Sequence, residues 1–300
     1  MEASLVDPSP RKIAGMDVGP LAFGHWRFVG DDDAGADALV EAALDLGMNL
    51  HDTADVYGFD WGGEGMGHAE RRLGGVLSRH PDWREQMVIV TKGGIIPGVP
   101  YDSSPTYLRK ACEASLARIG VDHVDAYLIH RPDLLGHPEQ VAETLLGLRE
   151  EGKIGAIGVS NHTLEQTRAL EALLGEAVAV TQPEFSVAEL GPIRSGLFDH
   201  AMAVGTVPMA WSPLAGGRVP TGEGLPAPLV AVLDELAADR GVSRSAIAMA
   251  FVLAHPARPI AIVGSQKVER LEDAVTALGV GLTRADAYRI IEVSEGVPLP

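Results

Sequence analysis

Cysteine is almost absent from this sequence of 300 residues. Cys112 is the only one, so an intrachain disulfide is impossible, and neither a secreted disulfide scaffold nor a cysteine-rich zinc site fits. No apolar stretch approaches the length that spans a membrane. Residues 1–12 contain no apolar run of the kind found in a signal peptide. We therefore expect a protein of the reducing cytoplasm.

Positive charge is also scarce. The chain has 24 Lys and Arg against 41 Asp and Glu, which gives a formal net charge of -17. An acidic chain repels nucleic acid and anionic lipid surfaces, so we expect neither as a partner. A compositional bias of the source genome is the alternative explanation. In either case, an anionic ligand requires a local cationic pocket.

Short apolar runs alternate with stretches of helical period along the rest of the chain. The runs lack polar–apolar alternation for the most part, which is typical of parallel strands buried on both faces. They cover residues 18–26, 48–52, 87–92, 125–130, 154–160, 177–182, 207–211 and 260–264. The helical stretches that follow them cover residues 36–46, 68–77, 106–119, 138–151, 164–174, 196–204, 228–239 with 243–253, and 268–278.

This repeated order of strand and helix predicts an α/β fold in which one (β/α)8 barrel, a TIM barrel, forms a single domain over residues 1–300. An open doubly wound sheet is the alternative. That fold would need a G-x-G-x-x-G fingerprint between the first strand and the first helix. Residues 15–30 contain several glycines but not this spacing.

Polar residues stand at the C-terminal ends of the predicted strands, which form the active face of such barrels. Asp52, Lys92 and His130 end the second, third and fourth strands, and Tyr57 follows Asp52 by five residues. Taken singly, each has an ordinary interpretation as a cap, rim or surface residue. Their convergence on one rim favours a catalytic site. Later strands bring further polar groups to the same rim: Ser160, Asn161, Gln182, Trp211, Ser212 and residues 264–267.

The first four residues can form a general acid. A phenol has a pKa of about 10, and we expect the ammonium of Lys92 to lower that value in Tyr57. Asp52 would pair with Lys92 and keep it charged. His130 could donate a hydrogen bond to a carbonyl oxygen. Together they would protonate a developing alkoxide.

Several segments in order carry a resemblance to a known family. They are HDTADVYG, MVIVTKGG, DAYLIHRPD, KIGAIGVSN, TQPEFS, AWSPLAGG and IVGSQKVERLEDA, within residues 18–278. In these segments the chain resembles the aldo-keto reductase superfamily, and most of all a bacterial oxidoreductase subgroup. The resemblance implies an enzyme that interconverts carbonyls and alcohols. It also implies that Asp52, Tyr57, Lys92 and His130 form a catalytic tetrad with Tyr57 as proton donor.

The resemblance further implies a nicotinamide cofactor that lies extended across the barrel mouth. Ser160, Asn161 and Gln182 would hold the carboxamide, and Trp211 would stack on the nicotinamide ring. Residues 212–217 would run along the pyrophosphate and residues 264–270 along the adenosine. The implied cofactor-binding residues are Gly24, Trp26, Ser160, Asn161, Gln182, Trp211, Ser212, Pro213, Leu214, Gly216, Gly264, Ser265, Lys267, Arg270 and Asp273.

NADP(H) is favoured over NAD(H) by two cations. Lys267 and Arg270 fall together at the start of the last predicted barrel helix, and a helix N-terminus with two cations is a good phosphate site. Many relatives place a Glu-Asn pair after the cationic residue, whereas this chain has Leu-Glu-Asp-Ala at residues 271–274. Asp273 can keep one of the two adenine contacts.

Other functions remain open at this point. A cofactor-binding redox sensor or partner subunit with little turnover is one alternative, and a lyase with Lys92 as Schiff-base nucleophile is another. A metal-dependent hydrolase is disfavoured because His51-Asp52 lacks a spaced second histidine, so we expect no metal. We expect a monomer that takes a small carbonyl or alcohol substrate in a pocket walled by Trp26, Tyr57, His162, Phe185 and residues 62–67.

Overall fold

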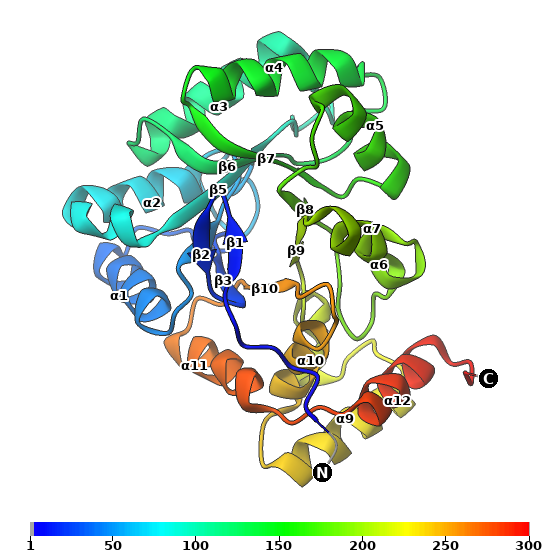
Figure 1. Cartoon of the computed structure of the whole chain (residues 1–300). Coiled ribbons are helices and arrows are strands. Elements are labelled where there is room, and N and C mark those ends of the chain that lie inside the picture. Colours follow the sequence, from blue (N-terminus) through cyan, green and yellow to red (C-terminus); the bar gives the residue numbers. More distant parts are fainter. Residues whose placement is uncertain (1–2, 300) are drawn as a thin grey trace.

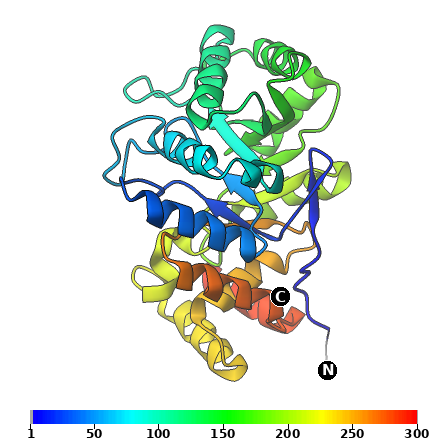
Figure 2. The ribbon, with the colours of Figure 1, turned by 90° about the vertical axis from the view of Figure 1, so that its left-hand side faces the viewer.

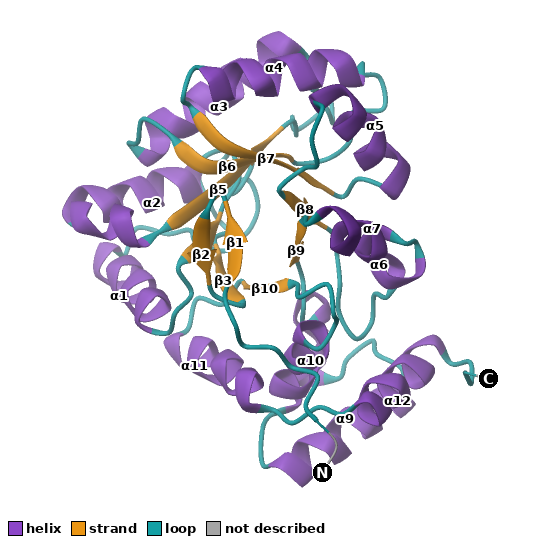
Figure 3. Cartoon of the chain, in the orientation of Figure 1, coloured by secondary structure: helices purple, strands orange, loops and turns teal. Residues whose placement is uncertain are grey.

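A ring of parallel strands is the centre of the computed structural model, which describes residues 3–299 (Figure 1, Figure 3). Each strand pairs with the next along the chain, and the last pairs with the first, which closes the barrel. The predicted (β/α)8 barrel is therefore confirmed. Its strands are β3 (Leu21–Gly24), β4 (Leu50–Asp52), β5 (Val88–Gly93), β6 (Val124–Ile129), β7 (Ile154–Ser160), β8 (Val180–Gln182), β9 (Val207–Ala210) and β10 (Ile260–Val263).

Helices surround the barrel on its outside (Figure 1). Those of the outer ring are α1 (Asp33–Asp45), α2 (His68–Arg79), α3 (Pro105–Ile119), α4 (Pro138–Glu150), α5 (Leu164–Leu174), α7 (Leu197–Val204), α10 (Arg244–Leu253) and α11 (Val268–Thr276). Additional helical segments are α6 (Gly191–Arg194), α8 (Arg218–Thr221), α9 (Ala227–Arg240), α12 (Arg284–Glu295), η1 (Pro81–Gln86), η2 (Ala215–Gly217) and η3 (Ala277–Gly279).

The strands have apolar neighbours on both faces. Leu50, Val90 and Leu128 pack inside the barrel, whereas Ile89 and Tyr127 belong to the larger cluster between the strands and the helices. This double burial is the physical reason why the strand sequences lack polar–apolar alternation. The tightly packed ring is a rigid platform for side chains at the strand ends.

A hairpin of β1 (Arg11–Ile13) and β2 (Met16–Val18) precedes the barrel. Ile13 and Val18 are buried and join the cluster inside the barrel. Figure 2 shows the hairpin at one end of the barrel and long loops at the opposite end. The first barrel strand, predicted over residues 18–26, is confirmed as β3, but its bounds were too wide, because Gly19-Pro20 separates Val18 of β2 from β3 and proline cannot donate to a strand ladder.

Local signals at the helix ends agree with the sequence. The Ser104 side chain caps α3, which begins at Pro105 and ends at the left-handed Gly120 with φ 77°. The helix α12 was not among the predicted ones, although Thr283 and Asp286 form a capping box at its start. None of the helices within residues 3–299 has both the length and the hydropathy that a bilayer crossing requires.

Candidate active site

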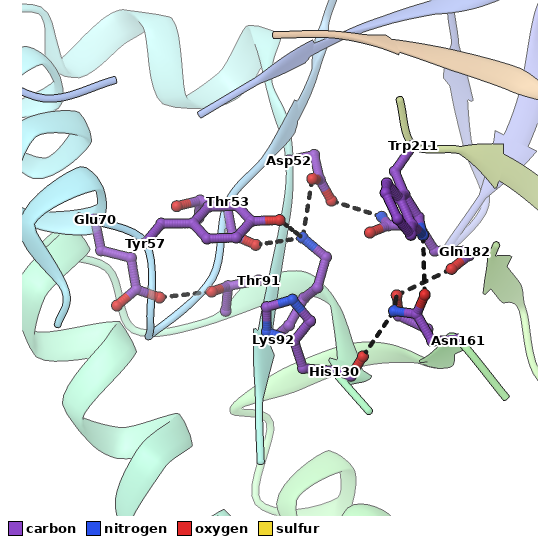
Figure 4. Close-up of polar contacts among 11 residues, drawn as sticks. Asp52, Thr53, Tyr57, Glu70, Thr91, Lys92, His130, Asn161, Gln182 and Trp211 are labelled. Atoms are coloured by element: carbon purple, nitrogen blue, oxygen red, sulfur yellow. Dashed lines mark hydrogen bonds and ion pairs between the residues drawn. The ribbon is translucent and has the colours of Figure 1, made fainter. Parts of the chain in front are cut away.

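The four residues of the predicted tetrad meet at the C-terminal mouth of the barrel (Figure 4). Asp52 is the last residue of β4, Lys92 lies near the end of β5, and His130 follows directly after β6. Tyr57 lies in the turns after β4, held by a hydrogen bond from its amide to the carbonyl of Ala54, with N and O 3.1 Å apart. Neighbouring parallel strands therefore deliver three of the side chains, and one loop delivers the fourth.

The ammonium of Lys92 is the centre of this arrangement. Its side chain is fully buried, and Nζ lies 2.9 Å from Asp52 Oδ2, 2.8 Å from the carbonyl oxygen of Thr53 and 3.1 Å from the Tyr57 hydroxyl. An ammonium has three N–H donors, so each can meet one of these oxygens. This complete set of partners fixes the lysine against the phenol, as Figure 4 shows.

The charges of this cluster follow from burial and pairing. Burial lowers the pKa of Lys92, but Asp52 and Tyr57 together outweigh it and raise the pKa above its usual value. The amine therefore stays protonated at neutral pH. A Schiff-base lyase needs a neutral lysine, so this environment argues against that alternative.

The phenol of Tyr57 departs from the expectation of a lowered pKa. Burial raises its pKa above the usual value, and the nearby charge of Lys92 offsets this only in part. The expected direction was wrong because desolvation of a phenolate is not visible in the spacing of residues along the chain. The phenol consequently keeps its proton at neutral pH and can act as a donor.

His130 lies edge-on to Tyr57, with ring centroids 5.7 Å apart and an interplanar angle of 79°. Burial, followed by the charges of Lys92 and Arg131, lowers the pKa of the imidazole well below its usual value. Its Nδ1 is buried and has no hydrogen-bond partner within residues 3–299. The ring is thus a neutral group beside the proton donor.

A chain of hydrogen bonds runs from Asp52 across the mouth. The side-chain amide of Gln182 donates to Asp52 Oδ1 at 2.7 Å, and the Ser160 hydroxyl donates to the backbone carbonyl of Gln182 at 2.9 Å. Asn161 donates to Ser160 Oγ at 2.8 Å and accepts from the indole of Trp211 at 3.0 Å. These four residues, which the resemblance assigns to the nicotinamide, are therefore held in one network with the tetrad (Figure 4).

One cavity of about 760 Å³ opens above this network. Of the tetrad, Asp52, Tyr57 and His130 line it, while Lys92 lies behind them. The implied cofactor residues that line it are Gly24, Trp26, Ser160, Asn161, Gln182, Trp211, Ser212, Pro213, Leu214, Gly216, Gly264, Ser265, Arg270 and Asp273.

Some sequence expectations do not match this lining. Lys267 is exposed and lies outside the set of lining residues. Phe185 is 1% exposed and packs against Phe198 in the core, so it is not a pocket wall. His162 and residues 62–67 are also absent from the lining, whereas Phe59 and Asp60 of the same loop are present.

The start of α11 lies at one end of the cavity. Lys267 is the residue before the first turn of this helix, and Arg270 lies within that turn. Asp273 accepts a hydrogen bond from the Ser243 hydroxyl at 2.8 Å, which ties α11 to the start of α10. The two predicted phosphate-binding cations are thus brought to one helix N-terminus.

Sequence reasoning missed a buried polar cluster behind the tetrad. Glu70 on α2 accepts from the Thr91 hydroxyl at 2.5 Å and pairs with Arg118 at 2.6 Å. Asp55 lies near this cluster, and its pKa is raised to about 8 by burial and by Glu70. Glu70 and Arg118 are 48 residues apart, and no local motif marks such a contact. Among the described residues, no group of His, Cys, Asp and Glu could hold a metal ion.

A family model described as the Aldo/keto reductase family matches residues 20–295. The chain belongs to this family. The resemblance identified from its motifs is therefore confirmed, and the site described above is that of an aldo/keto reductase family member.

Two relatives of this aldo/keto reductase family member are named 6-dehydroglucose reductase. The one from Novosphingobium aromaticivorans is 47% identical over 290 residues, which cover 96% of this chain and 95% of that protein. The one from Agrobacterium fabrum is 32% identical over 295 residues, which cover 94% of this chain and 96% of that protein.

Solved structures of the family have the same architecture. A glycerol dehydrogenase from Gluconobacter oxydans aligns with a TM-score of 0.83 and 27% identity, over 98% of this chain and 97% of that one. An aldo/keto reductase from Klebsiella pneumoniae, in complex with NADP and acetate, aligns with a TM-score of 0.81 and 25% identity over the same shares. The barrel architecture is thus shared with these two proteins.

Proposed function

We propose that this protein is an NADP(H)-dependent reductase that converts aldehydes and ketones to alcohols, with Tyr57 as the proton donor. The observation that carries the proposal is the 3.1 Å contact between the Tyr57 hydroxyl and the buried ammonium of Lys92 at the floor of the cavity. A reduced nicotinamide supplies the hydride when it is bound. The residues of the chain supply orientation, charge and the proton.

The proton transfer follows from the charges of the tetrad. Burial keeps the Tyr57 phenol protonated until a stronger base, the developing alkoxide, forms beside it. Once the proton leaves, the ammonium of Lys92 stabilises the phenolate at short range in a site of low dielectric. Asp52 holds that ammonium charged and aimed. Solvent then returns a proton to Tyr57.

The neutral imidazole of His130 has a different role in this proposal. A neutral ring carries one N–H and can donate a hydrogen bond without competing as an acid. We assign it to the carbonyl oxygen of the substrate, which it would hold within reach of the Tyr57 hydroxyl. This division of work uses one group to orient and another to protonate.

The residues of the cavity fit an extended dinucleotide. Its volume of about 760 Å³ lies within the usual range of ligand sites. Ser160, Asn161 and Gln182 offer amide and hydroxyl groups for the carboxamide, and Trp211 offers a ring for stacking. Residues 212–217 would follow the pyrophosphate, and Gly24 and Trp26 line the same cavity.

A 2′-phosphate fits the end of the cavity at α11. Arg270 lines the cavity there, and its guanidinium has no ion pair or hydrogen bond with any described residue. An unpaired cation at a helix N-terminus favours a bound phosphate, all the more in a chain of net charge -17. We therefore propose NADP(H) over NAD(H), with Lys267 and Ser265 as further contacts at this end and Asp273 as a contact of the adenine.

A sugar aldehyde is the substrate class that we propose. The support is the 47% identity, over nearly the whole chain, to a protein named 6-dehydroglucose reductase. Such a substrate is a hexose whose C6 carries an aldehyde, and its reduction at the tetrad would give the primary alcohol.

Two measurements test the proposal. Fluorescence titration with NADPH and NADH should give the tighter binding for NADPH. Steady-state oxidation of NADPH, followed by its absorbance at about 340 nm, should then depend on added aldehyde. Tight binding of NADPH without turnover of any aldehyde or ketone would overturn the reductase and favour the redox-sensor alternative.

A further inference from the structure

Arg131 differs from the other arginines of the chain. It follows His130 directly, lines the cavity and is partly buried. Within residues 3–299, Arg131 and Arg270 are the arginines whose guanidinium groups make neither an ion pair nor a hydrogen bond with the protein. Each of the others has at least one such partner, for example a carboxylate, as for Arg168 with Glu165 at 3.4 Å, or a backbone carbonyl, as for Arg71 with Met66 at 3.2 Å. Both exceptions line the same cavity.

An unpaired guanidinium in this position requires a physical reason. The group has five N–H donors in a fixed fork, and its partial burial removes part of the water that would otherwise satisfy them. Glu184 feels its charge but forms no ion pair with it. The charge also acts on Tyr57 and His130, which places it at the reacting end of the cavity. Arg131 is therefore positioned to meet a part of the substrate close to its carbonyl group.

The rest of this end indicates which chemistry would meet Arg131. The carboxylate of Asp60 lines the same cavity. Trp61 lies outside the lining and supports Trp26 edge to face, with ring centroids 5.7 Å apart, while the Arg27 guanidinium lies 4.3 Å from the Trp61 ring centroid. A hydroxyl group of the substrate can accept a hydrogen bond from a guanidinium and donate one to a carboxylate. An anionic group of the substrate would instead be repelled by Asp60 and by the net charge of -17. Trp26 lines the cavity and is 40% exposed, so its indole ring can meet the apolar face of a sugar or polyol.

We propose that Arg131 is a specificity-determining residue, whose guanidinium donates hydrogen bonds to hydroxyl oxygens next to the carbonyl of a neutral polyhydroxylated aldehyde. The inference rests on the proposed reductase function and adds the residue that selects the substrate. A site built to bind hydroxyl groups discriminates strongly against an analogue that lacks them, because its own polar groups are then left without partners.

The test compares two aldehydes of equal chain length, D-glyceraldehyde and propanal, with NADPH as reductant. Arg131→Gln removes the charge and the fork, Arg131→Lys keeps the charge alone, and Arg168→Gln is the matched control on the exposed face of α5. The readout is the ratio of kcat/KM for D-glyceraldehyde to that for propanal. Succinic semialdehyde serves as an anionic third substrate.

In Arg131→Gln we expect this ratio to fall about 10- to 100-fold, the usual range for a lost hydrogen bond to a charged group. Arg131→Lys should give an intermediate ratio, and Arg168→Gln the ratio of the wild type. An equal fall for both aldehydes would show that Arg131 acts only through its field at Tyr57 and would overturn the inference. A fall confined to succinic semialdehyde would overturn it in favour of an anion site. If the wild type reduces none of the three aldehydes, the proposed function itself fails.

Discussion

The buried pair of Asp52 and Lys92 allows a quantitative prediction for Asp52→Asn. The aspartate accepts from Lys92 through Oδ2 and from Gln182 through Oδ1. Asparagine has one carbonyl oxygen and one NH2 group in place of these two oxygens. It can therefore serve one of the two donors but must turn an N–H toward the other, and the ammonium of Lys92 loses its counter-ion while remaining buried.

The expected loss of stability at pH 7 is about 3–5 kcal/mol, the usual cost of removing one partner of a buried pair. The folded variant can also avoid a buried charge if Lys92 loses its proton, so the free-energy cost of that loss is an upper limit on the destabilisation. For an amine with a pKa of about 10.4 that escape costs about 4–5 kcal/mol at pH 7 and about 2 kcal/mol at pH 9, at about 1.4 kcal/mol per unit of pH. The destabilisation should therefore shrink as the pH is raised to 9.

Urea denaturation of wild type and variant at both pH values measures this difference. Asp37→Asn is the control, because Asp37 pairs with Arg79 at 2.7 Å on the surface, where such pairs contribute less than about 1 kcal/mol. If Asp52→Asn costs no more than the control, or costs the same at pH 9 as at pH 7, then Lys92 is not a buried ammonium held by Asp52.

Two further predictions concern the binding of the cofactor and the stability of the fold at acidic pH. Arg270→Ala should raise the Kd for NADPH about 10- to 100-fold and leave that for NADH nearly unchanged, as measured by fluorescence titration; equal effects on both would contradict a 2′-phosphate contact. Burial lowers the pKa of His25 well below its usual value and that of His51 to about 3, so below about pH 6.5 the unfolded chain binds protons that the folded chain does not. The stability that these rings contribute is thus present at neutral pH and falls with acidification, by roughly 2 kcal/mol per histidine at pH 5. Urea denaturation at pH 7.5 and 5 should show this loss of stability, and the loss should be smaller in His51→Asn. A loss as large in the variant as in the wild type would show that His51 does not contribute to it.

The barrel was predictable because its strands and helices have local periods. Apolar runs and capping residues such as Ser104 and Thr163 are written within a few neighbouring residues. The tetrad was predictable for a related reason: once the strands are placed, their C-terminal ends must meet at one mouth. Asp52, Lys92 and His130 then follow from the strand boundaries alone.

What escaped prediction depends on contacts between distant segments. The direction of the Tyr57 pKa depends on burial, which no spacing reveals. Phe185 could be a pocket wall or a core residue by sequence, and packing against Phe198 decides for the core. The lack of a partner for Arg131 depends on where acceptor groups lie in the folded cavity, which its place in the sequence does not show. Expected properties such as the monomeric state and the cytoplasmic location stay predictions, and sedimentation can measure the first.

The most direct test of the proposed chemistry is the Tyr57→Phe variant. It removes one oxygen and keeps the ring that lies over Lys92, whose Nζ is 4.7 Å from the ring centroid. If Tyr57 donates the proton, kcat/KM for aldehyde reduction should fall by about 100- to 10,000-fold, the usual contribution of a general acid, while the Kd for NADPH stays near that of the wild type. Turnover at the wild-type rate in this variant would contradict the assignment of Tyr57 as the proton donor.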